Sequence, residues 1–185
     1  EDAFDPAVRD AALTETGIAQ ATAMQPEIQA LDPTLLVMSP LTRNLQTGHF
    51  ACQPLLECTD NASAPEVLIT PLLREHTYST CDIGTHPEQL VEIWPVWAHH
   101  LCGLPAQWWA HDSEAASDAD RSLYREPWQK LQQRAAELIS LLEEKSKEHR
   151  NIVVVGHAVL FYALTGNWMA NCQLVEFDLS AARPP

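Results

Sequence analysis

The chain has 185 residues, 46% of them hydrophobic, which is enough to build one domain around a sizeable core. Its formal net charge of -14 repels phosphate backbones and argues against nucleic acid as a partner, although a local pocket of Arg, His and backbone N–H groups can still bind a phosphate group. No run of about 18 or more apolar residues occurs, so we expect no membrane-spanning helix.

The first third of the chain predicts a helix, a strand and a second helix in succession. Thr14 opens a helix with apolar residues at helical spacing, and Pro33 ends it. The short apolar run 35–38 lies between prolines and is typical of a buried parallel strand. Pro40 cannot continue a central ladder but can begin a helix, so we expect a helix over 41–52.

The middle of the chain predicts one more strand and then a long irregular stretch. Residues 67–69 are apolar and read as a second short buried strand. Residues 72–120 contain four of the six Trp and most of the His. Such insertions are often lids or binding loops, but a surface excursion held by aromatic packing is an equal alternative.

The last third contains the clearest elements. Residues 126–149 predict a helix with a leucine-rich stripe on one face. The uncharged, β-branched run 152–155 predicts a central strand, and 158–164 predicts a helix that Gly166 ends. Residues 175–179 alternate as a strand exposed on one face would.

Strands alternate with helices along the chain, and this pattern predicts an α/β fold. We expect a three-layer α/β/α sandwich with a mostly parallel central sheet, formed as a single domain over 1–185 with the insertion 72–120 inside it. Ligands of such sheets bind beyond the carboxyl ends of the strands. Residues 39–43 and the pair Gly156-His157 both follow predicted strands, so a site is expected there.

Three residues at or just past strand ends form a candidate site: Arg43, Glu75 and His157. A fixed cation, a carboxyl and an imidazole suit the binding of a phosphoryl group and proton transfer around it. Each residue also has a simpler interpretation. Arg43 could pair on a helix surface, Glu75 could be a solvated carboxylate, and His157 could be a core histidine with a satisfied hydrogen bond.

Four segments resemble motifs of the histidine phosphatase superfamily, which includes phosphoglycerate-mutase-like proteins. Residues 13–21 (LTETGIAQA) resemble the family's Leu-Thr…Gly…Gln-Ala helix. Residues 37–47 (VMSPLTRNLQT) resemble the family's motif in which a strand ends in Ser-Pro and an Arg follows on a helix. Residues 73–75 (LRE) resemble its acid motif, and 153–157 (VVVGH) its second-histidine motif. The order and spacing agree, and the likeness extends over about 4–179.

Smaller segments resemble the fungal, plant and protist branch of that superfamily. These are residues 81–84 (CDIG), 87–90 (PEQL), 94–95 (WP) and 104–109 (LPAQWW). The resemblance implies a phosphorylated small molecule or a phosphoprotein as the substrate, and it implies no cofactor.

The resemblance also implies a mechanism and a role for each candidate residue. In this family a histidine of an Arg-His-Gly motif attacks phosphorus and becomes phosphohistidine. By position, Arg43 and His157 match residues that hold the phosphoryl oxygens, and Glu75 matches the proton donor. No metal is required, and the adjacent pair His99-His100 has poor chelating geometry.

The family's nucleophile motif is absent from this sequence. No His is followed by Gly, only about a dozen residues precede Leu13, and Ala158 replaces the Gly that often follows the second histidine. We expect a central first strand that carries Arg-His-Gly upstream of this chain, and without it two strand edges exposed inside the sheet. A partner chain could supply that strand, or the sheet could be rebuilt.

The sequence is compatible with two main functions and with a third, weaker one. The first is phosphomonoester hydrolysis through phosphohistidine in the complete protein, with the segment 94–109 forming part of the substrate pocket wall. The second is a catalytically inactive pseudoenzyme that serves as a structural or binding subunit and has protein partners. The third is a phosphate sensor that uses Arg43 and His157. The sequence leaves open whether the protein acts in the cytoplasm or in an organelle.

Overall fold

A computed structural model describes residues 8–57, 64–110 and 125–179, and its helices and strands alternate as expected. The longer elements are α1 (Glu15–Ala23), α2 (Gln25–Ala30), β1 (Leu35–Met38), α3 (Thr42–Leu56), β2 (Glu66–Ile69), α4 (Pro87–Ile93), α5 (Ala98–Leu101), α6 (Trp128–Lys145), β3 (Ile152–Val155) and α7 (Ala158–Thr165). Three-residue 3₁₀ turns are η2 (Pro71–Leu73), η3 (Thr80–Asp82) and η4 (Pro95–Trp97).

The sheet of the described residues has three parallel strands in the order β2-β1-β3. Leu35 of β1 lies opposite Glu66 on one side and Ile152 on the other. All four residues of β1 are buried, as is usual for a central parallel strand covered on both faces. The prediction of an α/β fold with a parallel sheet is therefore confirmed.

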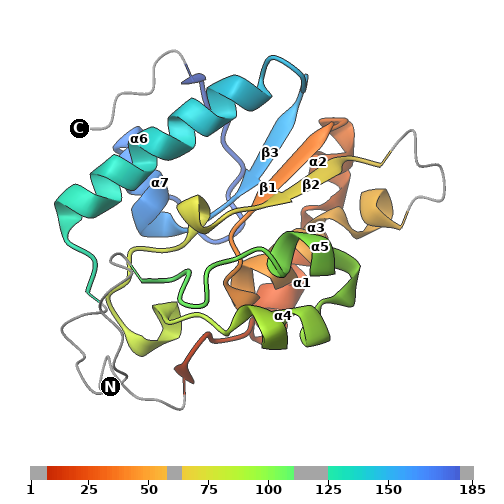
Figure 1. Cartoon of the computed structure of the whole chain (residues 1–185). Helices are drawn as coiled ribbons and strands as arrows, with labels where there is room; N and C mark the ends of the chain where they lie inside the picture. The colour runs from red at the N-terminus through yellow and green to blue at the C-terminus, as the bar shows by residue number, and fades with distance from the viewer. Residues whose placement is uncertain (1–7, 58–63, 111–124, 180–185) are drawn as a thin grey trace.

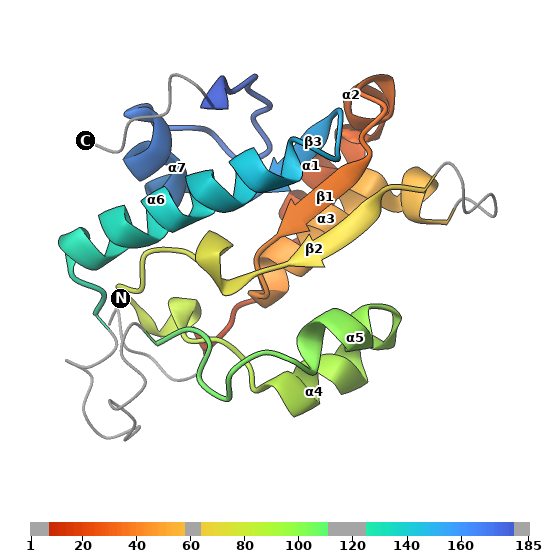
Figure 2. The same ribbon diagram turned by 45° about the horizontal axis from the view of Figure 1, so that its top comes forward.

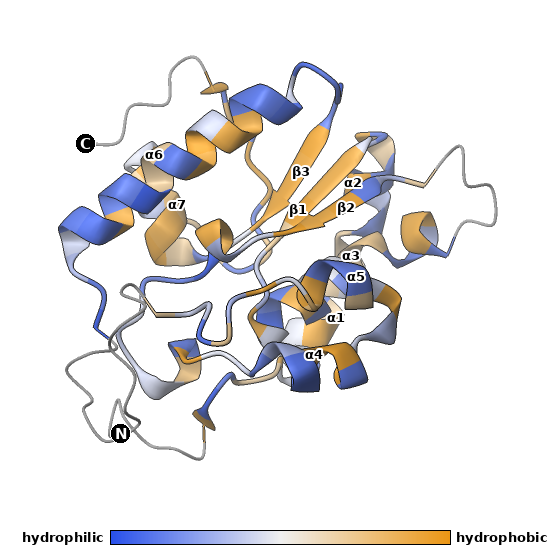
Figure 3. Ribbon diagram, viewed as in Figure 1, coloured by the Kyte–Doolittle hydropathy of each residue, from blue (hydrophilic) through white to orange (hydrophobic). Residues whose placement is uncertain are grey.

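Helices cover both faces of this sheet (Figures 1 and 2). Leu35 and Val37 point into a core formed with α6 and α7. Leu36 and Val153 point the opposite way, into a core formed with α2 and α3. This alternation follows from the two-residue period of a strand, and it explains why β1 and β3 are apolar along their whole length (Figure 3).

The helix predicted from Thr14 is two helices in the structure. Met24 caps the end of α1 and the start of α2. Pro26 lies in the first turn of α2, where its missing N–H costs no helical hydrogen bond. A proline at that place cannot continue the preceding helix, so the chain starts a new one.

The described sheet differs from three expectations about the strands. β3 lies at an edge of this sheet, and β1 is its central strand. The expected gap inside the sheet does not occur either, because β1 pairs with β2 and with β3 over all four residues. Residues 175–179 form no strand: alternation alone does not make one when no neighbouring strand offers hydrogen bonds.

The described part of the predicted insertion consists of short helices that pack on the sheet. Trp97, Trp108 and Trp109 are buried there in a core that they share with Met38 and Ile69. Aromatic packing thus holds residues 71–110 in place. Whether the segment also acts as a lid stays a prediction, and residues 111–120 of it lie outside the described part.

Candidate active site

Arg43 lies in the first turn of α3, directly after the end of β1. Its Nη1 donates to the carbonyl of Cys81 (2.7 Å), and its Nη2 donates to Asp82 Oδ1 (2.9 Å). The side chain is 22% exposed. Within the described residues these bonds engage two of the five N–H donors of a guanidinium, so the group is held at one end while the rest faces the site.

His157 is the N-cap residue of α7, just beyond β3. Its Nε2 is buried and has no hydrogen-bond partner among the described residues. Burial, with the nearby charges of Arg43 and Arg134, holds the pKa of His157 well below its ordinary value. The imidazole is therefore neutral at neutral pH, and one of its polar atoms is left for a ligand.

Glu75 follows η2 and turns its carboxyl toward the first turn of α7. Oε1 accepts from the N–H of His76 (2.8 Å) and of Leu160 (3.3 Å), and Oε2 accepts from the N–H of Val159 (3.4 Å). Burial raises the pKa of Glu75, although the N–H groups of His76 and Val159 oppose this rise. A buried carboxyl that keeps its proton closer to neutral pH suits a proton donor.

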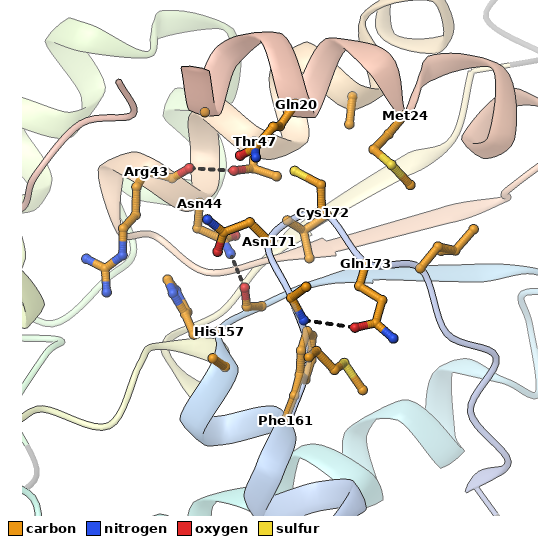
Figure 4. A pocket seen from close by; sticks show the side chains of 18 of the residues that line it. Gln20, Met24, Arg43, Asn44, Thr47, His157, Phe161, Asn171, Cys172 and Gln173 are labelled. Carbon is orange, nitrogen blue, oxygen red and sulfur yellow. Dashed lines mark hydrogen bonds between the residues drawn. The ribbon is translucent and has the colours of Figure 1, made fainter. Parts of the chain in front are cut away.

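The three predicted residues line one groove of about 400 Å³. The groove follows β3 along 153–155, between α1 and α3 on one side and residues 169–174 on the other. Figure 4 shows Arg43 and His157 side by side at one end of it. The structure thus brings the predicted side chains together, and their roles stay predictions. None of residues 94–109, predicted as a pocket wall, lines this groove.

The composition of the groove changes along its length. Val153 to Val155, Met24 and Phe161 make one part apolar, whereas Arg43, Glu75 and His157 make the other polar. An anion can be held at that end by a guanidinium and an imidazole, with a carboxyl beside it for proton transfer.

Asn44 is a site residue that the sequence did not reveal. Its Oδ1 accepts from the N–H of Ser39 (2.9 Å), and its Nδ2 donates to the carbonyl of Gly156 (3.2 Å). One amide thus ties the end of β1 to the residue before His157, and it keeps Arg43 and His157 at the same end of the groove (Figure 4). An amide in a polar-looking helix turn gives no local signal of this long-range contact.

Asp10 is a second residue that sequence reasoning missed. Its carboxylate accepts from the N–H of Thr42 (2.8 Å), the hydroxyl of Thr42 (2.8 Å) and the N–H of Thr85 (3.1 Å). It therefore caps the start of α3 from a distant part of the chain, one residue before Arg43. Asp10 is 7% exposed and has a φ of 43°, a conformation that Asp tolerates better than most residues.

The described residues contain neither a cluster of metal-ligating side chains nor a membrane-spanning helix. In 8–57, 64–110 and 125–179, no three His, Cys, Asp or Glu side chains come together as metal ligands would. No helix in these ranges is long and apolar enough to cross a membrane.

Comparison with known protein families identifies a relationship over most of the chain. The sequence model of the histidine phosphatase superfamily (branch 1) matches residues 7–181, which is nearly the whole chain. No curated protein matches the chain at a significant level.

Proposed function

The chain belongs to the histidine phosphatase superfamily (branch 1), and from this premise we propose that it forms most of a phosphomonoester hydrolase that works through phosphohistidine. Membership supports a phosphatase- or mutase-like function in general. The narrower hydrolase assignment, and the likeness to the fungal, plant and protist branch, belong to the proposal. Hydrolysis asks less of the site than mutase chemistry because water, and not a recaptured substrate, completes the cycle.

One observation carries this proposal above the others. The buried Nε2 of His157 lacks a partner among the described residues, and Arg43 and Glu75 line the same groove. A buried polar atom without a hydrogen bond costs free energy, about 1–3 kcal/mol, unless a ligand completes it. A phosphoryl oxygen held between the imidazole and the guanidinium would do so.

The proposed nucleophile lies on a further strand that pairs with β3. The carbonyl of Asn151 accepts from the N–H of Leu35, so Ile152 and Val154 direct their backbone groups to the other side. In the described part of the chain no strand pairs on that side, although β3 contains no charged residue. A parallel strand there would end at the polar end of the groove, beside His157.

The proposed reaction has two steps. The nucleophilic nitrogen bonds to phosphorus while the ester P–O bond breaks, and the leaving oxygen takes a proton from Glu75. Water then bonds to phosphorus, the N–P bond breaks, and Glu75 takes the proton of the water, which releases inorganic phosphate. Arg43 stays charged throughout and stabilises the negative oxygens of both transition states.

The test starts from the full gene product isolated from its native source. Its intact mass and N-terminal sequence reveal whether a strand with Arg-His-Gly is present. Incubation with a ³²P-labelled phosphomonoester should then give an acid-labile, alkali-stable label on histidine. A product that has no such strand and takes up no label would overturn the hydrolase and favour the pseudoenzyme.

Two arginine variants make the test specific to the site. Arg43→Ala in the full product should lower kcat/KM by roughly 10²- to 10³-fold, the usual cost of losing one preorganised oxyanion donor. Arg150→Ala is the matched control because the Arg150 side chain is 71% exposed and forms an ion pair with exposed Asp32. Equal activity of the two variants would remove Arg43 from the mechanism.

A further inference from the structure

Arg134 of α6 binds the backbone around Glu75, in the segment 72–77 that we name the acid loop. Arg134 is 5% exposed, and all five of its N–H donors are engaged. Nε donates to Glu126 Oε1 (2.9 Å), and Nη2 donates to Glu126 Oε2 (2.5 Å). The other three bonds go to main-chain carbonyls: Nη1 donates to those of Leu72 (2.9 Å) and Arg74 (2.7 Å), and Nη2 donates to that of Glu75 (3.3 Å).

Glu126 completes this arrangement from the other side of the acid loop. Its Oε1 also accepts from Arg74 Nη2 (2.7 Å), its N–H donates to the carbonyl of Thr77 (2.9 Å), and its carbonyl accepts from His76 Nε2 (2.7 Å). Burial alone would raise the pKa of Glu126, but the charges of Arg134 and Arg74 outweigh it and lower this pKa. The carboxylate therefore stays ionised between two cations.

The backbone of Glu75 is thus fixed on one side, and its carboxyl is fixed on the other. Arg134 binds the carbonyls of Arg74 and Glu75, while the carboxyl accepts from the N–H groups of Val159 and Leu160 in α7. We propose that Arg134 is a positioning residue for Glu75: it sets the loop so that the carboxyl reaches the first turn of α7 at the polar end of the groove.

This inference rests on the proposed function, in which Glu75 is the proton donor. A purely structural role is the competing explanation, since buried ion clusters occur without any catalytic purpose and are often replaceable by apolar side chains. The geometry favours positioning because three of the five bonds go to main-chain carbonyls of the loop that carries the acid. A lysine has three donors on one nitrogen and cannot span this set of acceptors.

The experiment compares Arg134→Lys with Arg150→Lys in the full chain. The charge is kept in both, but Arg150 is exposed and contacts no part of the acid loop in the described structure. Thermal unfolding shows whether each variant folds. Carboxyl ¹³C NMR of glutamate-labelled protein then gives the titration of Glu75, which is assigned with Glu75→Gln, and the amide signals of Val159 and Leu160 report its contact with α7.

The expected result is specific to Arg134→Lys. The loop loosens, Glu75 becomes more solvated, and its pKa falls toward the ordinary value because burial is what raises it. The amides of Val159 and Leu160 should then follow its protonation more weakly. Arg43 and Asp82 are the other charges that act on Glu75, and neither contacts Arg134 by hydrogen bond, so their effect should stay the same.

An Arg134→Lys protein that folds and titrates at Glu75 like the parent overturns the proposal. If that variant does not fold, Glu126→Gln decides, since it keeps the shape of the carboxylate and removes its charge. A Glu75 titration that is unchanged in Glu126→Gln likewise overturns it, and a pKa that falls supports it.

Activity separates this inference from the proposed function. In a full product that forms phosphohistidine, Arg134→Lys should lower kcat by roughly 10- to 100-fold with little change in KM, the cost of misplacing a catalytic group by about 1 Å. Full activity in that variant overturns the positioning role alone. A Glu75 titration that moves in a protein that never forms phosphohistidine leaves the positioning in place and removes the hydrolase.

Discussion

The two edges of the described sheet differ in how well they are protected from pairing with a further strand. The edge strand β2 begins with exposed Glu66, whose Oε2 lies 3.6 Å from His149 Nε2. The helix α5 packs beside this strand. Charged residues and covering helices are how proteins protect an edge from further pairing. The residues of β3 carry no charge, and Val153, Val154 and Val155 line the apolar part of the groove. A strand built like β3 normally has neighbours on both sides.

The packing around the sheet repeats this contrast. The core between the sheet and the helices α6 and α7 contains fully buried leucines such as Leu131, Leu138 and Leu160. Leu13 and Met24, which line the groove beside β3, are half-buried. Side chains of the same kind are therefore packed closely on one side and left with space on the other. The core is closely packed beside α6, whereas a groove remains beside β3, where we propose that the strand with the nucleophile lies.

The largest effect is expected from the same substitution on the two sides. Leu138→Ala should lower the free energy of unfolding by about 2–5 kcal/mol, because it leaves a cavity in a filled core. Leu13→Ala should cost less than about 1.5 kcal/mol, since Leu13 is already half-exposed to the groove. Urea denaturation of the chain of residues 1–185 measures both values. Equal losses would mean that the groove side is as tightly packed as the core.

A proline in each edge strand tests which edge is paired in the full product. The N–H of Glu66 donates to Thr34, so Val67 directs its N–H away from β1, as Val154 does in β3. Val154→Pro should destabilise the full product by about 1–3 kcal/mol more than Val67→Pro, because it leaves a buried carbonyl of the added strand unpaired.

Chemical denaturation of the full product with each proline variant gives this difference. Both valines are half-buried, so their packing losses nearly cancel. Identical stabilities would show that no strand pairs with β3.

A smaller effect is expected at Asp10, which links the segment before α1 to the start of α3. Asp10→Ala should cost about 1–2 kcal/mol through the lost helix cap. Asp32→Ala is the matched control because its φ of 47° is close to the 43° of Asp10, while its side chain is 78% exposed. Thermal unfolding of both variants separates the cap from the backbone strain. A larger loss at Asp32 would contradict the capping role.

The smallest change in the free energy of unfolding is expected from a change of pH, which removes no side chain and acts through the protonation of His157. Its pKa is depressed in the folded protein, so the unfolded chain binds more protons between that lowered pKa and the ordinary value near 6.5. Stability should therefore be complete above pH 6.5 and fall as the pH drops below it. Glu75, with a raised pKa, acts in the opposite sense: its contribution is lost as pH rises.

The variant His157→Gln isolates this effect because glutamine does not titrate. The difference in unfolding free energy between the parent and the variant should decrease as the pH falls from 7.5 to 5.5. A difference that stays constant over this interval would show that His157 titrates alike in both states.

The sequence predicted the elements well where the signal is local. The apolar runs 35–38 and 152–155 are the strands β1 and β3, and Gly166, with a φ of 71°, ends α7 as expected. Four motifs in order also led to the family. Local patterns succeed here because burial, helical period and a left-handed C-cap are properties of a few neighbouring residues.

The candidate site was predicted in part. Arg43, Glu75 and His157 follow strand ends, and parallel strands bring such residues to one edge of the sheet. Arg134 was missed although it interrupts the leucine stripe of α6 three residues after Leu131. A charged residue on an apolar helical face is a usable signal that a buried partner exists, but it does not identify the partner.

The sequence by itself indicated that this chain is an α/β protein of the histidine phosphatase type, that Arg43, Glu75 and His157 follow strand ends, and that the printed sequence contains no Arg-His-Gly motif. Only the tertiary structure decided that β1 is central in the described sheet, that β3 lies at its edge, and that Arg134 binds the acid loop. The reason is physical: a β-branched, uncharged run specifies burial but not its partner, which for β3 is the distant strand β1, where Leu35 lies opposite Ile152. Arg134 is likewise 59 residues away from Glu75 along the chain.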